Sequence, residues 1–271
     1  MKSAIRILWV LVCCSICSGD ARAHDTWVQT NTQVVRAGEA VFIDLMLGNH
    51  GNDHRDFKLA GKPDLGSSTL NVFAPNAASY DLLQSIIDTG YAPSEGFWSA
   101  RFVGVSPGLY LVAHTSDKVV SYAPLRSIKS AKTFFVVTPS LDKVHAENPG
   151  FDRPLGHPLE LVPVSNPVTP MGPGKRIDVQ VLYLGKPLEG ARLSFIPRGT
   201  TLREGFDERY ERNADADGKA SFTPTEGNRF LVVVHKTDPA ARGKGYDGTK
   251  YSATLTVLVP QMCPCCDTIE E

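Results

Sequence analysis

The chain has 271 residues and a formal net charge of −1, with 28 Lys and Arg against 29 Asp and Glu. This balance argues against a nucleic-acid-binding protein, which would carry a basic excess. The length suits one large or two small domains, and 23 glycines with 19 prolines predict many turns between short strands.

The first 23 residues have the pattern of a secretory signal peptide. Lys2 and Arg6 precede a short apolar run, and Ala21-Arg22-Ala23 supplies an A-x-A cleavage site. The run is shorter than the ~20 residues that a membrane-spanning helix needs. A membrane anchor, or a lipid anchor on a signal-peptide cysteine, is the alternative. We therefore expect a periplasmic or secreted protein with His24 as its first residue.

The rest of the chain predicts an all-β fold, since long amphipathic helix patterns are nearly absent. Residues 80–88 are the one helical candidate, because their apolar residues recur at helical spacing. Short β-rich runs are typical of sandwich strands. The predicted strands are 27–30, 40–47, 70–74, 109–115, 133–137, 176–184, 191–197, 219–223, 230–235 and 251–259.

A proline-rich stretch divides these strands into two sets. Proline cannot donate to a sheet and is excluded from central strands. We expect a signal peptide at 1–23, an N-terminal β-sandwich at 24–139, a Pro-rich linker at 140–173, a C-terminal β-sandwich at 174–260 and a Cys-containing tail at 261–271. The linker also carries apolar residues, which predict that it packs across the first domain.

Two turn phrases mark the second domain. Residues 185–191 read GKPLEGA, and residues 215–220 read DADGKA. Gly218 can take a positive φ, and aspartate side chains can cap such a turn. A calcium loop is the alternative, although no later acidic ligands follow with EF-hand spacing. The two phrases resemble those of transthyretin-like and Cna-B-like sandwich modules.

Three sequence motifs, taken in chain order, resemble those of a known family over a larger part of the chain. They are HDTW at 24–27, GHPLELVP at 156–163 with Asn166-Pro167, and GKPL at 185–188. The sequence resembles a bacterial family of periplasmic β-sandwich proteins that is defined as a domain of unknown function. Some members are described as periplasmic components of nickel or cobalt uptake systems. The resemblance implies transition-metal binding and a membrane metal transporter as partner.

His24 is the sharpest candidate metal ligand. After cleavage it would offer its α-amine and its ring Nδ1 to one metal in a small chelate ring. Amine and imidazole ligands suit copper, nickel and cobalt. His24 could equally be no more than the residue where the signal peptide ends. A second histidine beside such an N-terminus would resemble the copper brace of oxidative polysaccharide-cleaving enzymes, of which only the start of the mature chain matches.

Four further histidines could converge on the same metal. His50 and His54 lie in a glycine-containing segment that reads as a loop, where binding residues often sit. His114 and His235 lie in predicted strands. The alternative for each is an ordinary strand histidine that binds no metal. An exposed polar loop is the alternative for the first pair.

The C-terminal motif MCPCCD, residues 262–267, offers an alternative metal site with soft sulfur ligands. Cys263, Cys265 and Cys266 suit Cu(I) or Zn(II). In an oxidising compartment thiols also pair, and three cannot all pair within one chain. Metal capture, disulfide formation and a passive tail all stay open.

No catalytic signature stands out: the sequence has no G-x-S-x-G elbow, P-loop or dinucleotide fingerprint. We therefore expect no enzyme, but a periplasmic accessory protein that binds nickel, cobalt or copper. The alternative is a cell-envelope binding or scaffolding module without a metal.

Overall fold

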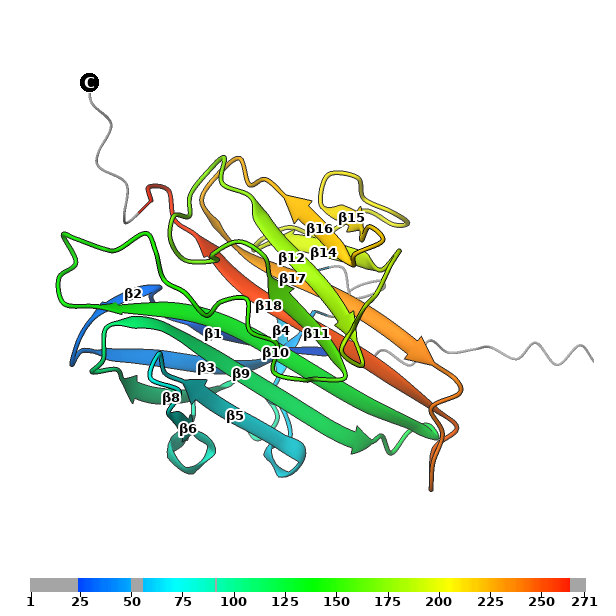
Figure 1. Ribbon diagram of the computed structural model, residues 1–271. Helices are drawn as coiled ribbons and strands as arrows, with labels where there is room; N and C mark the ends of the chain where they lie inside the picture. The colour runs from blue at the N-terminus through cyan, green and yellow to red at the C-terminus, as the bar shows by residue number, and fades with distance from the viewer. Residues whose placement is uncertain (1–23, 50–55, 91, 264–271) are drawn as a thin grey trace, which may run out of the picture.

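A computed structural model describes residues 24–49, 56–90 and 92–263 (Figure 1). The fold is all-β, as the sequence predicts, and among the described residues no helix is long and apolar enough to cross a membrane. The strands are β1 (Asp25–Thr30), β2 (Val34–Arg36), β3 (Ala40–Gly48), β4 (Leu59–Gly61), β5 (Ser68–Phe73), β6 (Ser79–Asp81), β7 (Ile86–Asp88), β8 (Trp98–Val103), β9 (Gly108–Val119), β10 (Leu125–Thr138), β11 (Leu159–Pro163), β12 (Ile177–Tyr183), β13 (Lys186–Pro187), β14 (Arg192–Pro197), β15 (Glu211–Asn213), β16 (Lys219–Phe222), β17 (Asn228–Asp238) and β18 (Gly248–Val259). Two 3-10 turns, η1 (Leu65–Ser67) and η2 (Leu83–Ser85), complete the elements.

One nine-stranded sheet runs through the molecule and contains strands from both halves of the chain. Its order is β15-β14-β17-β18-β10-β9-β5-β6, with β2 beside β10. Residues 125–132 of β10 pair in parallel with β18, and residues 136–138 pair in parallel with β2. The antiparallel partner β9 follows β10 along most of its length. Figure 1 shows these long strands crossing the centre of the molecule.

Smaller sheets cover both faces of this central sheet. One contains β1, β3, β8, β7 and β4, and the other contains β11, β12, β13 and β16. The side chains of β10 contact both covering sheets, because successive side chains of a strand point to opposite faces. Phe135 and Val137 pack against the first sheet, whereas Phe134 and Val136 pack against the second. The β-branched and aromatic residues of the central strands are therefore buried on both sides.

The proline-rich stretch contains a strand that the sequence analysis missed. Residues 159–163 form β11, which pairs with β12, and Leu159 and Leu161 are buried in the core. Glu160, between these two leucines in β11, accepts a hydrogen bond at 2.5 Å from Lys132 Nζ of β10, and both side chains are 2% exposed. The stretch is thus tied to the central sheet. The division into two domains stays a prediction.

The predicted helix at residues 80–88 is wrong. The segment instead contributes to β6, η2 and β7. β6 pairs with β5, and β7 pairs with β8, so that the backbone donors and acceptors of the segment go to neighbouring strands. Leu82 is buried between them. Pairing with neighbouring strands outweighs the helical spacing of the apolar residues, because a segment of nine residues forms only a marginal helix by itself.

Candidate functional site

The site lies at the start of β1, which is buried along its whole length. One edge of β1 pairs with β3. At its other edge, carbonyl groups accept hydrogen bonds from side chains of the central sheet: Lys129 Nζ donates to the His24 carbonyl, and Thr254 Oγ1 donates to the Thr26 carbonyl at 2.8 Å. A buried backbone carbonyl requires such a partner. These bonds fix where the first residues of the strand lie.

Asp25 and His235 form the centre of the site. His235 Nε2 lies 3.0 Å from both carboxylate oxygens of Asp25, and Asn49 Nδ2 donates to Asp25 Oδ2 at 2.5 Å. Asp25 is 1% exposed, whereas 44% of the His235 side chain is exposed. Burial lowers the pKa of His235, but the Asp25 carboxylate raises it by more, so that this pKa lies above its usual value.

A glycine positions Asn49 beside this pair. Gly48 is the register partner of Asp25, and a Cβ at Gly48 would lie 1.9 Å from the Lys58 carbonyl oxygen. Asn49 follows with a φ of 56°, in the left-handed region that asparagine tolerates better than most residues. The close approach of residue 58 and the turn at Asn49 together direct the amide toward Asp25.

Lys129 contacts the residue that precedes β1. It projects from β10, and its amine donates to the His24 carbonyl. Burial lowers the pKa of Lys129 to about 8, and the Asp25 carboxylate partly opposes this effect. The sequence analysis missed Lys129, Asp25 and Asn49. Only the position of Asp25 next to His24 could have drawn attention to one of them.

His114 is placed differently from the exposed ring of His235. It is 0% exposed, and its Nδ1 lies 2.8 Å from the Thr69 carbonyl oxygen. Its Nε2 is buried and has no hydrogen-bond partner within the described part of the chain. Burial lowers its pKa to about 4. The ring is therefore neutral at physiological pH and is closed off from solvent.

The remaining predicted ligands divide between described and undescribed residues. His50, His54, Cys265 and Cys266 lie outside the residues that the structure describes. Cys263 is half-buried just beyond β18. Within 24–49, 56–90 and 92–263, no three His, Cys, Asp or Glu side chains are grouped so that they could hold a metal ion. Of the predicted histidines in the described ranges, His235 is hydrogen-bonded to Asp25, and His24 directly precedes Asp25 in the chain.

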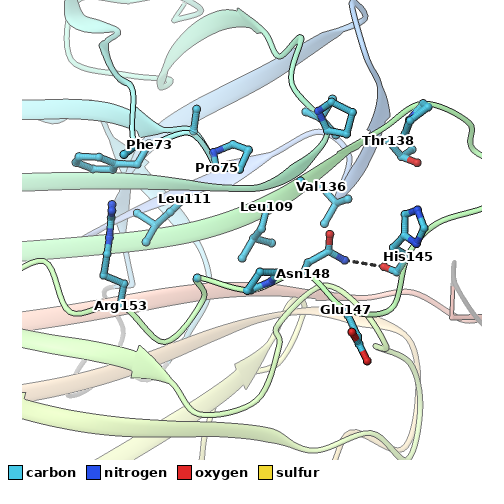
Figure 2. Close-up of a pocket in the computed structure, with 18 residues that line it drawn as sticks. Phe73, Pro75, Leu109, Leu111, Val136, Thr138, His145, Glu147, Asn148 and Arg153 are labelled. Atoms are coloured by element: carbon cyan, nitrogen blue, oxygen red, sulfur yellow. Dashed lines mark hydrogen bonds between the residues drawn. The ribbon is translucent and has the colours of Figure 1, made fainter.

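A separate recess lies away from these residues. It has a volume of about 370 Å³, and its floor is formed by apolar side chains that include Leu109, Leu111 and Val136. Figure 2 shows Arg153 at one end of this floor and His145 at the other, whereas the Glu147 carboxylate points away from it. The Arg153 guanidinium lies over the Phe73 ring, 5.4 Å from its centre. The recess is thus apolar inside and carries a cation at one end.

Comparison with known proteins gives a family but no activity. Residues 21–238 match the model of a family described as "Domain of unknown function (DUF4198)". No curated protein matches the chain.

Solved structures resemble the chain only distantly. A Salmonella alpha-2-macroglobulin is 14% identical, with a TM-score of 0.26 over 88% of this chain and 15% of its own. A DUF4785 family protein from Legionella pneumophila is 10% identical, with a TM-score of 0.29 over 76% of this chain and 52% of its own. The Yersinia pseudotuberculosis adhesin InvE is 11% identical, with a TM-score of 0.22 over 89% of this chain and 63% of its own. The chain thus spans less than two thirds of each, and scores this low support no argument about function.

Proposed function

The chain belongs to the DUF4198 family, whose description names no activity, and from the site itself we propose that it is a periplasmic transition-metal-binding accessory protein. The proposed ligands are His24 and His235. Nickel, cobalt and copper are the metals that the donor set suits. Delivery to a membrane transporter is the role that the family resemblance implies.

The hydrogen bond between Asp25 and His235 carries this proposal. A histidine that ligates a metal commonly donates its other ring N–H to a carboxylate, which fixes the tautomer and makes the ligating nitrogen more basic. Here Asp25 holds Nε2 at 3.0 Å, so the neutral ring has its lone pair on Nδ1. The His235 side chain is 44% exposed, which supports access from solvent.

His24 would supply the other donors. With cleavage after Ala23, its α-amine and its ring Nδ1 can chelate one metal, and its carbonyl is held by Lys129. Two residues then provide three donor atoms, one of which is not a side chain. This agrees with the absence of a three-side-chain group in the described ranges. Because Asp25 directly follows His24, one short segment orients both proposed ligands.

The experiment that tests the proposal is a calorimetric titration with nickel, cobalt and copper. The protein is expressed with its own N-terminal segment, and the form that begins at His24 is purified. Its matched control carries one extra residue before His24. We expect stoichiometric binding that weakens at least about tenfold in the control and in His235→Ala. Equal binding by all three proteins would overturn the proposed site.

The recess of Figure 2 favours a second candidate function, that of an envelope binding module without a metal. Its apolar floor and the Arg153 guanidinium at one end suit an extended peptide segment that carries apolar side chains and a carboxylate. Absence of metal binding in the titration, together with binding of such peptides that Arg153→Ala abolishes, would favour this reading.

A further inference from the structure

A second cavity, of about 390 Å³, opens beside the first residue of β1. It lies between β9 and β10 on one side and the segments that contain residues 62–64 and 93–98 on the other. Its lining combines amines, hydroxyls and one indole ring. The lining residues that bear on binding are Thr26, Lys62, Asp64, Trp98, Lys118 and Lys129.

The charge of this cavity is predominantly positive. Among the described residues, its lining contains three lysines and one carboxylate, that of Asp64. The carboxylate of Asp88, which is not part of this lining, pairs with Lys62. The Lys118 amine lies 3.7 Å from the Asp64 carboxylate, and both side chains are substantially exposed. An exposed ion pair of this kind is weak, and it leaves the Lys118 amine able to bind another anion.

Lys62 is held rigidly in the wall of the cavity. Its side chain is 4% exposed, its amine lies 2.8 Å from Asp88 Oδ2, and it sits 5.1 Å from the centre of the Trp98 ring. A lysine ammonium has three donors. The Lys62 amine already donates to both carboxylate oxygens of Asp88, so it acts on a bound anion chiefly through its charge. The indole gives the cavity an apolar wall beside that charge.

A buried hydroxyl adds an independent observation. Thr26 is 2% exposed and lines the cavity, yet its Oγ1 has no hydrogen-bond partner among the residues that the structure describes. Leaving a buried polar group without a partner is costly. A ligand oxygen would provide that partner. Ser116 and Ser127, also buried, line the same space.

We propose that this cavity binds a small organic anion with two or more carboxylate groups. The volume is at the lower end of small-molecule sites, which excludes a macromolecule. Amines from three separate elements suit several negative groups on one ligand, and Trp98 suits its carbon skeleton. The cavity and its side chains carry this inference, which does not depend on metal binding at His235.

The test uses the metal-free chain that begins at His24, with citrate as probe and inorganic phosphate as comparison, by calorimetry. The variant is Lys118→Met, since Lys118 is exposed and its loss leaves the core intact. Lys186→Met is the control, because Lys186 is exposed on β13, outside the cavity. We expect citrate to bind with one site, and Lys118→Met to weaken it about five- to tenfold while Lys186→Met leaves it unchanged.

A second variant, Thr26→Val, tests the hydroxyl without changing the charge. It should weaken citrate binding while the unfolding temperature of the free protein is kept or raised. The proposal is overturned if citrate shows no saturable binding up to about 10 mM, if Lys118→Met and Lys186→Met bind equally, or if phosphate binds as tightly as citrate. Metal binding measured separately distinguishes failure of this inference from failure of the metal site.

Discussion

Asp25 and His235 are 210 positions apart in the chain, and the carboxylate of the first holds the ring nitrogen of the second at 3.0 Å. The contact joins the first residue of β1 to β17, which lies beyond the proline-rich stretch. It also determines which nitrogen of His235 carries the proton. A buried carboxylate that pairs with an exposed imidazole is the part of the site that can be tested most directly.

Replacing Asp25 with Asn should lower the pKa of His235. The carboxylate is what raises this pKa, and the opposing effect of burial would remain. NMR titration of the His235 ring in the metal-free protein measures the shift. Asp142→Asn, an exposed change outside the site, is the control. An unchanged His235 pKa in Asp25→Asn would refute the pairing.

Asp25→Asn should also change how the free energy of unfolding varies with pH. Because the folded pKa of His235 is raised, its pairing with Asp25 stabilises the fold most below the unfolded pKa of about 6.5 and loses this effect as pH rises through the folded value. The loss of stability in Asp25→Asn should therefore be larger at acidic than at alkaline pH. Urea unfolding across this range measures it, and a constant difference would contradict the linkage.

His114 should make the fold sensitive to acid. Its pKa is lowered to about 4 by burial, so the unfolded chain binds a proton there before the folded chain does. Stability is then fully present above about 6.5 and falls as pH drops toward 4, by roughly 3 kcal/mol for this group. His114→Gln removes the titration, and its urea-unfolding curve should be flatter over this range. An unchanged slope would show that other groups govern the acid response.

Breaking the buried pair of Lys132 and Glu160 should be strongly destabilising. Lys132→Met should cost about 3–5 kcal/mol because it leaves a buried carboxylate unpaired. Glu160→Ala should cost more, since the same carboxylate also accepts backbone N–H groups of Leu155, Gly156 and His157. Urea unfolding measures both, with exposed Glu147→Ala as control. A smaller effect at Glu160 than at Lys132 would show that these backbone bonds contribute little.

Gly48 should tolerate no side chain. In Gly48→Ala the new Cβ would meet the Lys58 carbonyl oxygen at 1.9 Å and the Trp27 ring at 2.8 Å. We expect a loss of about 2–4 kcal/mol in the free energy of unfolding and a displaced Asn49. Gly66→Ala is the matched control, because its nearest neighbour would be a carboxylate oxygen at 3.4 Å. Similar stability of the two variants would contradict the close approach seen at Gly48.

Local pattern determined the all-β fold and most of the long strands. The predicted 40–47 and 251–259, for example, fall within β3 and β18. Alternation or a continuous run of β-branched and aromatic residues is a property of neighbours in sequence, so one segment carries the whole signal. The signal failed at residues 80–88, where a short period suggested a helix, and at β11, whose prolines concealed a strand.

Tertiary structure alone decided how the site is assembled. No local pattern in β17 specifies that His235 meets Asp25, because the contact depends on how β1 crosses the central sheet. The same holds for Lys129, whose amine reaches the His24 carbonyl from β10. The sequence could propose His24 and His235 as chemically suited residues. The contact of His235 with Asp25 required the register of strands far apart in the chain, which is set by core packing over the whole molecule.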